Sequence, residues 1–233
     1  MPQVATAESG MQRQSCLEKK GAQVIITRRR KEAIEKAALE LDAIGMIADQ
    51  SNLKVISNLA SAVHKQFGRI DILLINAGIT SVASIESTTE ILFDQVMHVN
   101  FKGAFFTLSM FIPFLNDGAS VVFLSSTSAR ISPPNASVYA ASKAALNAVM
   151  KIAAIELASK KIRVNAVSPG PIATEIMDKL GLHKNLENQM VNSRPLMRFS
   201  KPLEVANLIS YLLSDQALFI TGSEFLIDGG QSI

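Results

Sequence analysis

The chain has 233 residues, of which 48% are hydrophobic and 18% charged, a composition that fits one α/β domain with a substantial core and excludes a disordered chain. Its net charge of +3 is too small to indicate a nucleic-acid partner. The lone cysteine, Cys16, excludes a disulfide framework and favours a reducing cytoplasm, and no apolar run approaches the roughly 18 residues of a membrane span. We therefore expect a cytoplasmic protein that binds neither nucleic acid nor membrane.

Apolar strands alternate with helical stretches along most of the chain, although residues 1–20 contain no convincing strand. The strands are predicted at residues 24–27, 46–49, 72–75, 121–124, 163–167 and 225–227. The helices are predicted at residues 31–41, 53–67, 88–115, 137–157 and 202–213. The hydroxyls of Ser87 and Thr88 are available to cap the third helix. Continuously apolar strands between helices indicate a parallel sheet covered on both faces, so we predict one doubly wound, Rossmann-type α/β domain over residues 1–233.

Tyr139 and Lys143 are the first residues that indicate chemistry. They lie four positions apart on a predicted helix and therefore share one face. An ammonium fixed beside a phenol favours the phenolate, so we expect Lys143 to lower the pKa of Tyr139 toward a range that is useful for proton transfer. Taken alone, the two residues also fit an accidental pair on a solvated helix face.

Two further motifs flank this pair. Ser126 stands thirteen residues before Tyr139, and the segment Asn165-Ala166-Val167-Ser168-Pro169-Gly170 follows it. Together these motifs resemble the short-chain dehydrogenase/reductase family, and the resemblance runs from about residue 21 to residue 230. The family's active site is an Asn–Ser–Tyr–Lys group around a nicotinamide cofactor. The catalytic residues that the resemblance implies are Asn100, Ser126, Tyr139 and Lys143.

The resemblance also implies a role for each of these residues. Tyr139 exchanges a proton, Lys143 lowers the pKa of Tyr139 and holds the ribose, and Ser126 polarises the substrate oxygen. Asn100 shapes a relay through water and backbone to Lys143, although by itself it is also compatible with a helix-surface asparagine. The neighbouring hydroxyls, which could merely cap or turn the chain, are Ser125, Thr127 and Ser128.

Cofactor contacts are implied after successive strands. The segment Asn76-Ala77-Gly78 ends an apolar strand, where ligands of such sheets bind, and it matches the floor of the family's adenine–ribose pocket. An ordinary turn is the alternative, because Asn and Gly both suit one. Asp49 matches the family's adenine contact but is equally compatible with a helix cap for the segment beginning at Asn52. The residues that match the loop beside the nicotinamide and its phosphates are Pro169, Gly170, Ile172 and Thr174.

Arg28 and Arg29 stand where the second family strand ends, the place that selects between NAD and NADP. An acid at this point binds the ribose 2′-hydroxyl, whereas an arginine accommodates a 2′-phosphate. The segment contains arginine and no acid, so we predict that NADP is preferred and that NAD remains possible. Arg30 and Lys31 are interpreted as a solvated charge run leading into a helix.

The amino terminus departs from the family pattern. The family opens with an apolar strand and then Thr-Gly-x-x-x-Gly-x-Gly, whose glycines let the backbone approach the cofactor pyrophosphate. The corresponding positions here hold Gln3, Val4, Glu8 and Gly10, of which only Gly10 fits. We therefore expect the first strand and the glycine-rich loop to be missing or altered.

One hypothesis is that the first seventeen residues are read in the wrong frame. If each codon is rebuilt from the last base of one codon and the first two of the next, the segment can read ATGGNSGIGxATAKLF, which is the family's loop and first helix. It meets Glu18 in the correct register. Because the first strand lies in the middle of the family's sheet, we then expect the chain as written to fold poorly and to bind no NADP.

The function that these features imply is hydride transfer between a nicotinamide and a secondary alcohol or carbonyl, with a 3-oxoacyl group, a sugar or a small alcohol as substrate. The alternatives are a dinucleotide-binding regulator without turnover and an inactive product of a frameshifted gene. Residues 175–197 are expected to form a substrate lid, and the family resemblance implies a homotetramer or homodimer that pairs helices 88–115 and 137–157. The histidines His64, His98 and His183 form no ligand spacing with cysteine or acids, so no metal site is predicted.

Overall fold

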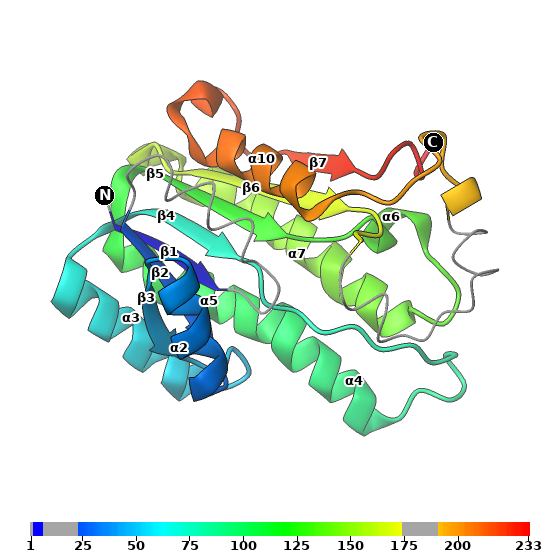
Figure 1. The fold of residues 1–233 in the computed structure, drawn as a ribbon, viewed down its shortest axis with the longest axis horizontal. Coiled ribbons are helices and arrows are strands. Elements are labelled where there is room, and N and C mark those ends of the chain that lie inside the picture. The colour runs from blue at the N-terminus through cyan, green and yellow to red at the C-terminus, as the bar shows by residue number, and fades with distance from the viewer. Residues whose placement is uncertain (1, 7–22, 174–190) are drawn as a thin grey trace.

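Seven parallel strands form one sheet in the computed structural model, which describes residues 2–6, 23–173 and 191–233 (Figure 1). The strands are β1 (Pro2–Thr6), β2 (Gln23–Arg28), β3 (Ile44–Ile47), β4 (Ile70–Ile75), β5 (Leu115–Leu124), β6 (Arg163–Pro169) and β7 (Glu224–Ile227). Their order across the sheet is β3-β2-β1-β4-β5-β6-β7. This is the strand order of a doubly wound nucleotide-binding fold, so the predicted fold class is confirmed.

Helices cover both faces of this sheet. The helices are α2 (Lys31–Glu40), α3 (Leu53–Phe67), α4 (Glu90–Met97), α5 (Ala104–Phe111), α6 (Ser128–Ile131), α7 (Ser137–Glu156) and α10 (Pro202–Leu213). α2 and α10 pack on one face, whereas α3, α5 and α7 pack on the other (Figure 1). The inner strands β2, β4, β5 and β6 are therefore largely buried on both sides, which explains their apolar segments, whereas the edge strands β3 and β7 are partly exposed.

The central strand β1 corrects one expectation from the sequence. Pro2–Thr6 pairs in parallel with both β2 and β4, so a first strand is present at the place where we expected it to be missing or altered. The two neighbours present buried N–H and C=O groups that need partners, and this short segment supplies them. Pro2 stands at the first position of the strand, where a missing N–H is tolerated. The predicted position of the glycine-rich loop, Gly10 included, lies outside the described residues.

The helix predicted over residues 88–115 is divided. α4 is followed by a π-helical turn, His98–Gly103, then by α5 and a 3₁₀ turn, Ile112–Phe114, before β5 begins. The cap is Thr89, whose Oγ1 accepts a hydrogen bond from the Leu92 N–H at 3.2 Å. Ser87 and Thr88 do not cap it, because their hydroxyls donate to the Ser84 carbonyl.

α7 is the one helix of the described ranges that is long and apolar enough to cross a membrane by length and composition. It packs against β6 and buries Lys143 and Asn147 on its inner face. These contacts are those of a helix that covers a sheet in the protein core.

The start of α3 tests the interpretation of Asp49 as a helix cap. Asn52 caps the helix, because its side-chain oxygen accepts hydrogen bonds from the N–H groups of Lys54 and Val55 at 3.1 and 3.2 Å. Asp49 instead accepts bonds from the N–H and hydroxyl of Ser51, so it is not the helix cap.

We predict that Asn52→Ala lowers the free energy of unfolding by about 1 kcal/mol, because two N–H groups of the first turn lose their acceptor. Thermal unfolding followed by circular dichroism should show a melting temperature about 2–4 °C lower. Ser51→Ala is the control, since it removes an exposed hydroxyl from the same loop and should change stability by less than about 0.5 kcal/mol. Equal melting temperatures for Asn52→Ala and the wild type would contradict this assignment.

Candidate active site

Ser126 and Tyr139 meet where the carboxyl end of β5 lies against the first turn of α7. Ser126 follows β5 and is 8% exposed, and its hydroxyl lies near enough to the phenol of the half-buried Tyr139 to favour the ionised form of that phenol. Its Oγ also accepts a bond from the Ser128 N–H at 3.2 Å. A hydroxyl and a phenol thus converge at the edge of the sheet where parallel folds bind ligands.

The hydrogen-bond partners of the hydroxyl residues around Ser126 distinguish their roles. Ser125 Oγ donates to the Lys143 carbonyl at 3.2 Å, and Thr127 Oγ1 donates to the Pro169 carbonyl at 3.3 Å. These two bonds tie the end of β5 to α7 and to the end of β6. Both side chains are therefore structural, and Ser126 is the one placed against Tyr139.

Burial raises the pKa of the Tyr139 phenol above its ordinary value, and the hydrogen bond from Ser126 opposes this rise without reversing it. The Lys143 ammonium lies 5.8 Å from the centre of the Tyr139 ring. The pKa of Tyr139 is thus shifted upward in this structure, against the predicted net lowering, because the desolvation of the phenol is the largest influence on it. Tyr139 is protonated at neutral pH.

Lys143 is almost fully buried, with 3% of its surface exposed. Its Nζ donates a hydrogen bond to the Leu124 carbonyl at 2.9 Å. A Cβ on Gly78 would lie only 3.2 Å from this Nζ and 3.4 Å from Asn100 Oδ1. The absence of a side chain at Gly78 thus lets the ammonium and the Asn100 amide approach the same point.

Asn100 lies in the π-helical turn and is fully buried, so the interpretation as a helix-surface asparagine is wrong. Its Oδ1 accepts from the Ile79 N–H at 2.8 Å, and its Nδ2 donates to the Ile79 carbonyl at 2.9 Å and to Ser142 Oγ at 3.1 Å. Ser142 in turn donates to the Tyr139 carbonyl at 2.7 Å. Asn100 therefore joins the chain after β4 to the first turn of α7.

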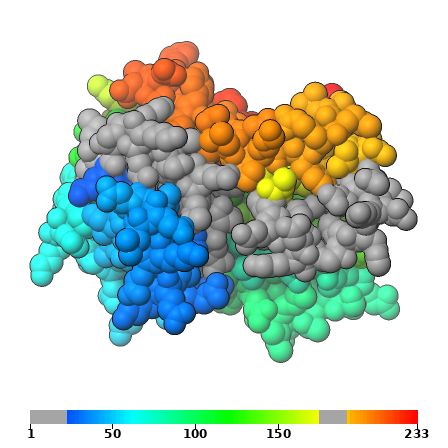
Figure 2. Space-filling view, in the orientation of Figure 1, coloured from blue at the N-terminus to red at the C-terminus, as the bar shows by residue number. Residues whose placement is uncertain are grey.

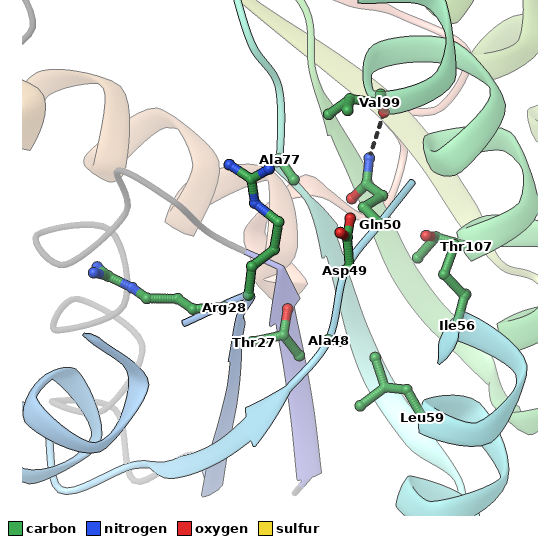
Figure 3. A pocket seen from close by; sticks show the side chains of 11 residues that line it. Thr27, Arg28, Ala48, Asp49, Gln50, Ile56, Leu59, Ala77, Val99 and Thr107 are labelled. Atoms are coloured by element: carbon green, nitrogen blue, oxygen red, sulfur yellow. Dashed lines mark hydrogen bonds between the residues drawn. The ribbon is translucent and has the colours of Figure 1, made fainter. Parts of the chain in front are cut away.

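A pocket opens beside this cluster, at the carboxyl ends of β2 and β3 and against the residue after Asn76 (Figure 3). It is lined by Thr27, Arg28, Arg29, Ala48, Asp49, Gln50, Ile56, Leu59, Ala77, Val99 and Thr107. The structure thus brings the predicted residues Arg28, Arg29, Asp49 and Ala77 to one pocket. Asn76 is buried at the end of β4, next to this wall.

The residues of this pocket fit the adenosine half of a dinucleotide. Arg28 and Arg29 line its open side, and apolar side chains such as Ile56 and Leu59 line it further in. Gln50 Oε1 is buried there and has no hydrogen-bond partner within the described ranges. A pocket that combines cations, a carboxylate and buried amide oxygen suits a polar aromatic ligand with an anionic group.

The loop after β6 contacts the C-terminal turn. Gly170 N–H donates to the Ile227 carbonyl at 3.0 Å, and a Cβ on Gly170 would lie 3.0 Å from the Cβ of Asp228. Ile172 forms a bridge with Ser200. Pro169, Gly170 and Ile172 are thus held at the same edge of the sheet, whereas Thr174 lies outside the described residues.

The predicted lid is described only from residue 191 onward. Arg194 is buried, and its guanidinium lies 5.2 Å from the centre of the Phe199 ring. Leu196 is exposed, and its N–H bonds the Gly229 carbonyl at 3.1 Å. The apolar residues Met177, Leu180, Leu182 and Met190 lie outside the described residues. In the space-filling view, α10 and residues 191–200 lie along the upper side of the molecule, and α4 lies along its lower side (Figure 2).

The sequence reading missed a polar network behind Ser126. Glu224 is nearly buried and accepts two hydrogen bonds from Arg130, at 2.9 and 2.8 Å, and one from Ser168 at 2.6 Å. Arg130 belongs to α6, the short helix that follows Ser126. Ser168 lies within the predicted Asn165–Gly170 motif and was the one signal of this network in the sequence. Its partner Glu224 is 56 residues away, so the sequence alone did not connect the two.

Comparisons with known proteins place this geometry in context. A family model described as enoyl-(acyl carrier protein) reductase matches residues 10–232. The 3-oxoacyl-[acyl-carrier-protein] reductase FabG of Thermotoga maritima is 37% identical over 217 residues, which cover 90% of this chain and 87% of that protein. An uncharacterized oxidoreductase of Methylorubrum extorquens is 34% identical over 221 residues, covering 92% and 89%. A solved short-chain dehydrogenase/reductase from Serratia marcescens BCRC 10948 superimposes with a TM-score of 0.94 at 28% identity, covering 100% and 98%.

The ionisation of Glu224 predicts a pH-dependent stability. Burial raises the pKa of this carboxyl, but hydrogen bonds from Arg130, Ser168 and Asn147 together hold it below the ordinary value of 4.5. A carboxyl with a lowered folded-state pKa stabilises the fold above pH 4.5, and this contribution is lost as the pH falls through the folded-state pKa.

We expect Glu224→Gln to lower the free energy of unfolding by about 1–2 kcal/mol at neutral pH, since Arg130 is half exposed and its charge is partly screened. The difference between Glu224→Gln and the wild type should shrink as the pH falls below 4.5. Urea unfolding at a series of pH values measures it. A difference that stays constant from neutral to acidic pH would exclude this role for the carboxylate.

Proposed function

Because the chain belongs to the short-chain dehydrogenase/reductase family and is an NAD(P)-dependent oxidoreductase of CH–OH or carbonyl groups, we propose that it prefers NADP and reduces a 3-oxoacyl group. The 3-oxoacyl class is supported by the identity with the Thermotoga protein. Sugars and small secondary alcohols are the other candidate substrates. The proposed location is the cytoplasm.

The observation that carries this proposal is the meeting of the Ser126 hydroxyl and the Tyr139 phenol at one edge of the sheet, with the buried Lys143 ammonium 5.8 Å from the Tyr139 ring centre. A substrate carbonyl that accepts a bond from each of these hydroxyls has its oxygen fixed and its carbon polarised. The neighbouring pocket with Arg28 and Asp49 supports binding of the cofactor's adenosine half at the same edge of the sheet.

The proposed roles follow from the protonation state of Tyr139. Since the phenol is protonated at neutral pH, it can donate a proton to the oxygen of a reduced carbonyl. Ser126 orients that oxygen, and Lys143 holds its ammonium between the end of β5 and Gly78. Asn100 keeps the loop after β4 against α7. When bound, NADP(H) supplies or accepts the hydride.

We predict that Tyr139→Phe lowers kcat by at least about 100-fold and leaves the Kd of NADPH within about twofold, because the hydroxyl enters the proton step rather than cofactor binding. The assay follows NADPH absorbance with a 3-oxoacyl thioester, a keto sugar and a small ketone. An enoyl thioester tests the reaction named by the matching family model. Ser125→Ala is the matched control, since its hydroxyl bonds a backbone carbonyl.

The outcomes separate the alternatives. If Tyr139→Phe retained most of the wild-type kcat, Tyr139 would not be the proton donor of the reaction. A wild-type chain that binds NADPH but does not oxidise it with any of these substrates would favour a dinucleotide-binding regulator. A chain that binds no NADPH would favour the frameshifted-gene hypothesis, and a chain with the restored frame and its upstream strand should then bind it.

The cofactor preference rests on the guanidinium of Arg28 in the adenosine pocket. We predict that NADPH binds more tightly than NADH, and that Arg28→Asp narrows or reverses the preference by replacing a partner of the 2′-phosphate with a partner of the 2′-hydroxyl. Fluorescence titration of both cofactors measures the ratio of Kd values. Arg30→Asp is the control, because Arg30 does not line this pocket. Equal affinities in the wild type would overturn the proposed preference.

Assembly is proposed through α4, α5 and α7. These helices expose large apolar side chains, namely Ile91, Phe93, Phe105, Ile152 and Ile155. A second exposed apolar group near β7, formed by Leu218, Phe219 and Leu226, offers another contact that would extend a dimer to a tetramer.

We predict a homodimer or homotetramer at micromolar concentration, and Phe105→Glu should shift it toward smaller species by placing a charge in the interface. Size-exclusion chromatography with light scattering gives the mass. Leu39→Glu on α2 is the control, because it changes an exposed apolar residue away from these helices. A wild-type monomer would count against the proposed assembly.

A further inference from the structure

The π-helical turn that carries Asn100 lies directly against Gln50, which follows β3. Gln50 Nε2 donates a hydrogen bond to the carbonyl of Val99, the residue before Asn100, at 3.0 Å (Figure 3). This bond joins positions 49 residues apart in the chain. It is a direct link between the wall of the adenosine pocket and the turn that holds Asn100 in place.

The other end of the same turn is also pressed against Gln50. A Cβ added to Gly103 would collide with the backbone carbonyl of Gln50 and lie 2.7 Å from its Cγ. Only a residue without a side chain therefore permits the turn to pack here. Gln50 contacts the turn on both sides of Asn100, at Val99 and at Gly103.

Gln50 is 9% exposed, and its Oε1 has no hydrogen-bond partner among the residues that the structure describes. The bond to Val99 is thus the hydrogen bond that orients this amide. π-helical turns are rare, and their widened backbone needs stabilisation from outside the helix. A buried side-chain donor to a carbonyl of the turn provides it.

The position of Asn100 is sensitive to the shape of this turn. Its amide makes bonds of 2.8, 2.9 and 3.1 Å to Ile79 and Ser142, and all three depend on where the turn places Cα of Asn100. Relaxation of the turn to regular helix would rotate the side chain away from these partners, because each residue of an α-helix advances by 100° rather than the smaller angle of a π turn.

We propose that Gln50 is a positioning residue that acts on catalysis through Asn100, by holding the Val99 carbonyl and with it the π-helical turn. This inference rests on the proposed function. It differs from a cofactor contact, because the donor of the Gln50 amide is directed at the protein backbone and not at the pocket.

The test is a double-mutant cycle. Gln50→Leu removes the donor at similar side-chain volume, and Gln50→Met is a second variant that keeps the unbranched shape. Each should lower kcat by about 10- to 100-fold, as expected for a misplaced catalytic group, and the Kd of NADPH, measured by fluorescence titration, reports separately on the loss of the Gln50 amide from the pocket wall. In an Asn100→Ala background, the same substitutions should change kcat by less than about twofold.

Ser120→Ala is the matched control, since Ser120 is also buried and also donates to a backbone carbonyl, that of Leu212, away from the site. It should lower the melting temperature without changing kcat. If the Gln50 substitutions lowered kcat by the same factor in the Asn100→Ala background as in the wild type, the inference would be overturned. A raised Kd of NADPH at unchanged kcat would also overturn it. These two contradicting outcomes can be observed only with an active wild type. A wild type that neither binds nor oxidises NADPH would refute the proposed function and this inference with it.

Discussion

The candidate active site depends on the paired hydrogen bonds between the Asn100 amide and the backbone of Ile79. A fully buried amide is stable only when its donors and acceptor are satisfied, and here the partners come from the chain after β4 and from Ser142 on α7. The amide therefore fixes the distance between two elements that do not pair within the sheet. Because Ser142 also bonds the Tyr139 carbonyl, the first turn of α7 is held in the same network.

The parallel sheet supplies the second constraint. Strands that all run in one direction bring their carboxyl ends to one edge, so the segments after β2, β3, β4, β5 and β6 meet there. The polar residues at this edge are separated by long stretches of sequence but adjoin in space. β1 is the central element of this arrangement, since its backbone bonds both β2 and β4.

Desolvation sets the chemistry of the phenol. Tyr139 and Lys143 share a face of α7, yet the Lys143 ammonium is directed at the Leu124 carbonyl, and burial raises the pKa of Tyr139. In a low-dielectric site, burial disfavours the charged phenolate, and it is the largest influence on the pKa of this phenol. A protonated phenol suits proton donation, which agrees with the proposed direction of carbonyl reduction.

Local patterns determined much of the fold. The predicted helices at 53–67 and 202–213 agree with α3 and α10, because apolar periodicity is a property of neighbouring residues. The apolar strands from β2 onward were likewise recognisable, since burial on both faces requires continuous apolar runs. The spacing of Tyr139 and Lys143 also sufficed to place them on one face.

Tertiary structure alone decided the rest. Pro2–Thr6 forms a strand because two buried neighbours need its backbone, a requirement that five weakly apolar residues do not reveal. The selection of Ser126 among neighbouring hydroxyls came from where each side chain finds a partner. The π-helical turn and the bond from Gln50 to Val99 join segments distant in sequence. Such long-range contacts leave no pattern in the local sequence, because each of the two segments has by itself the sequence of an ordinary helix or loop.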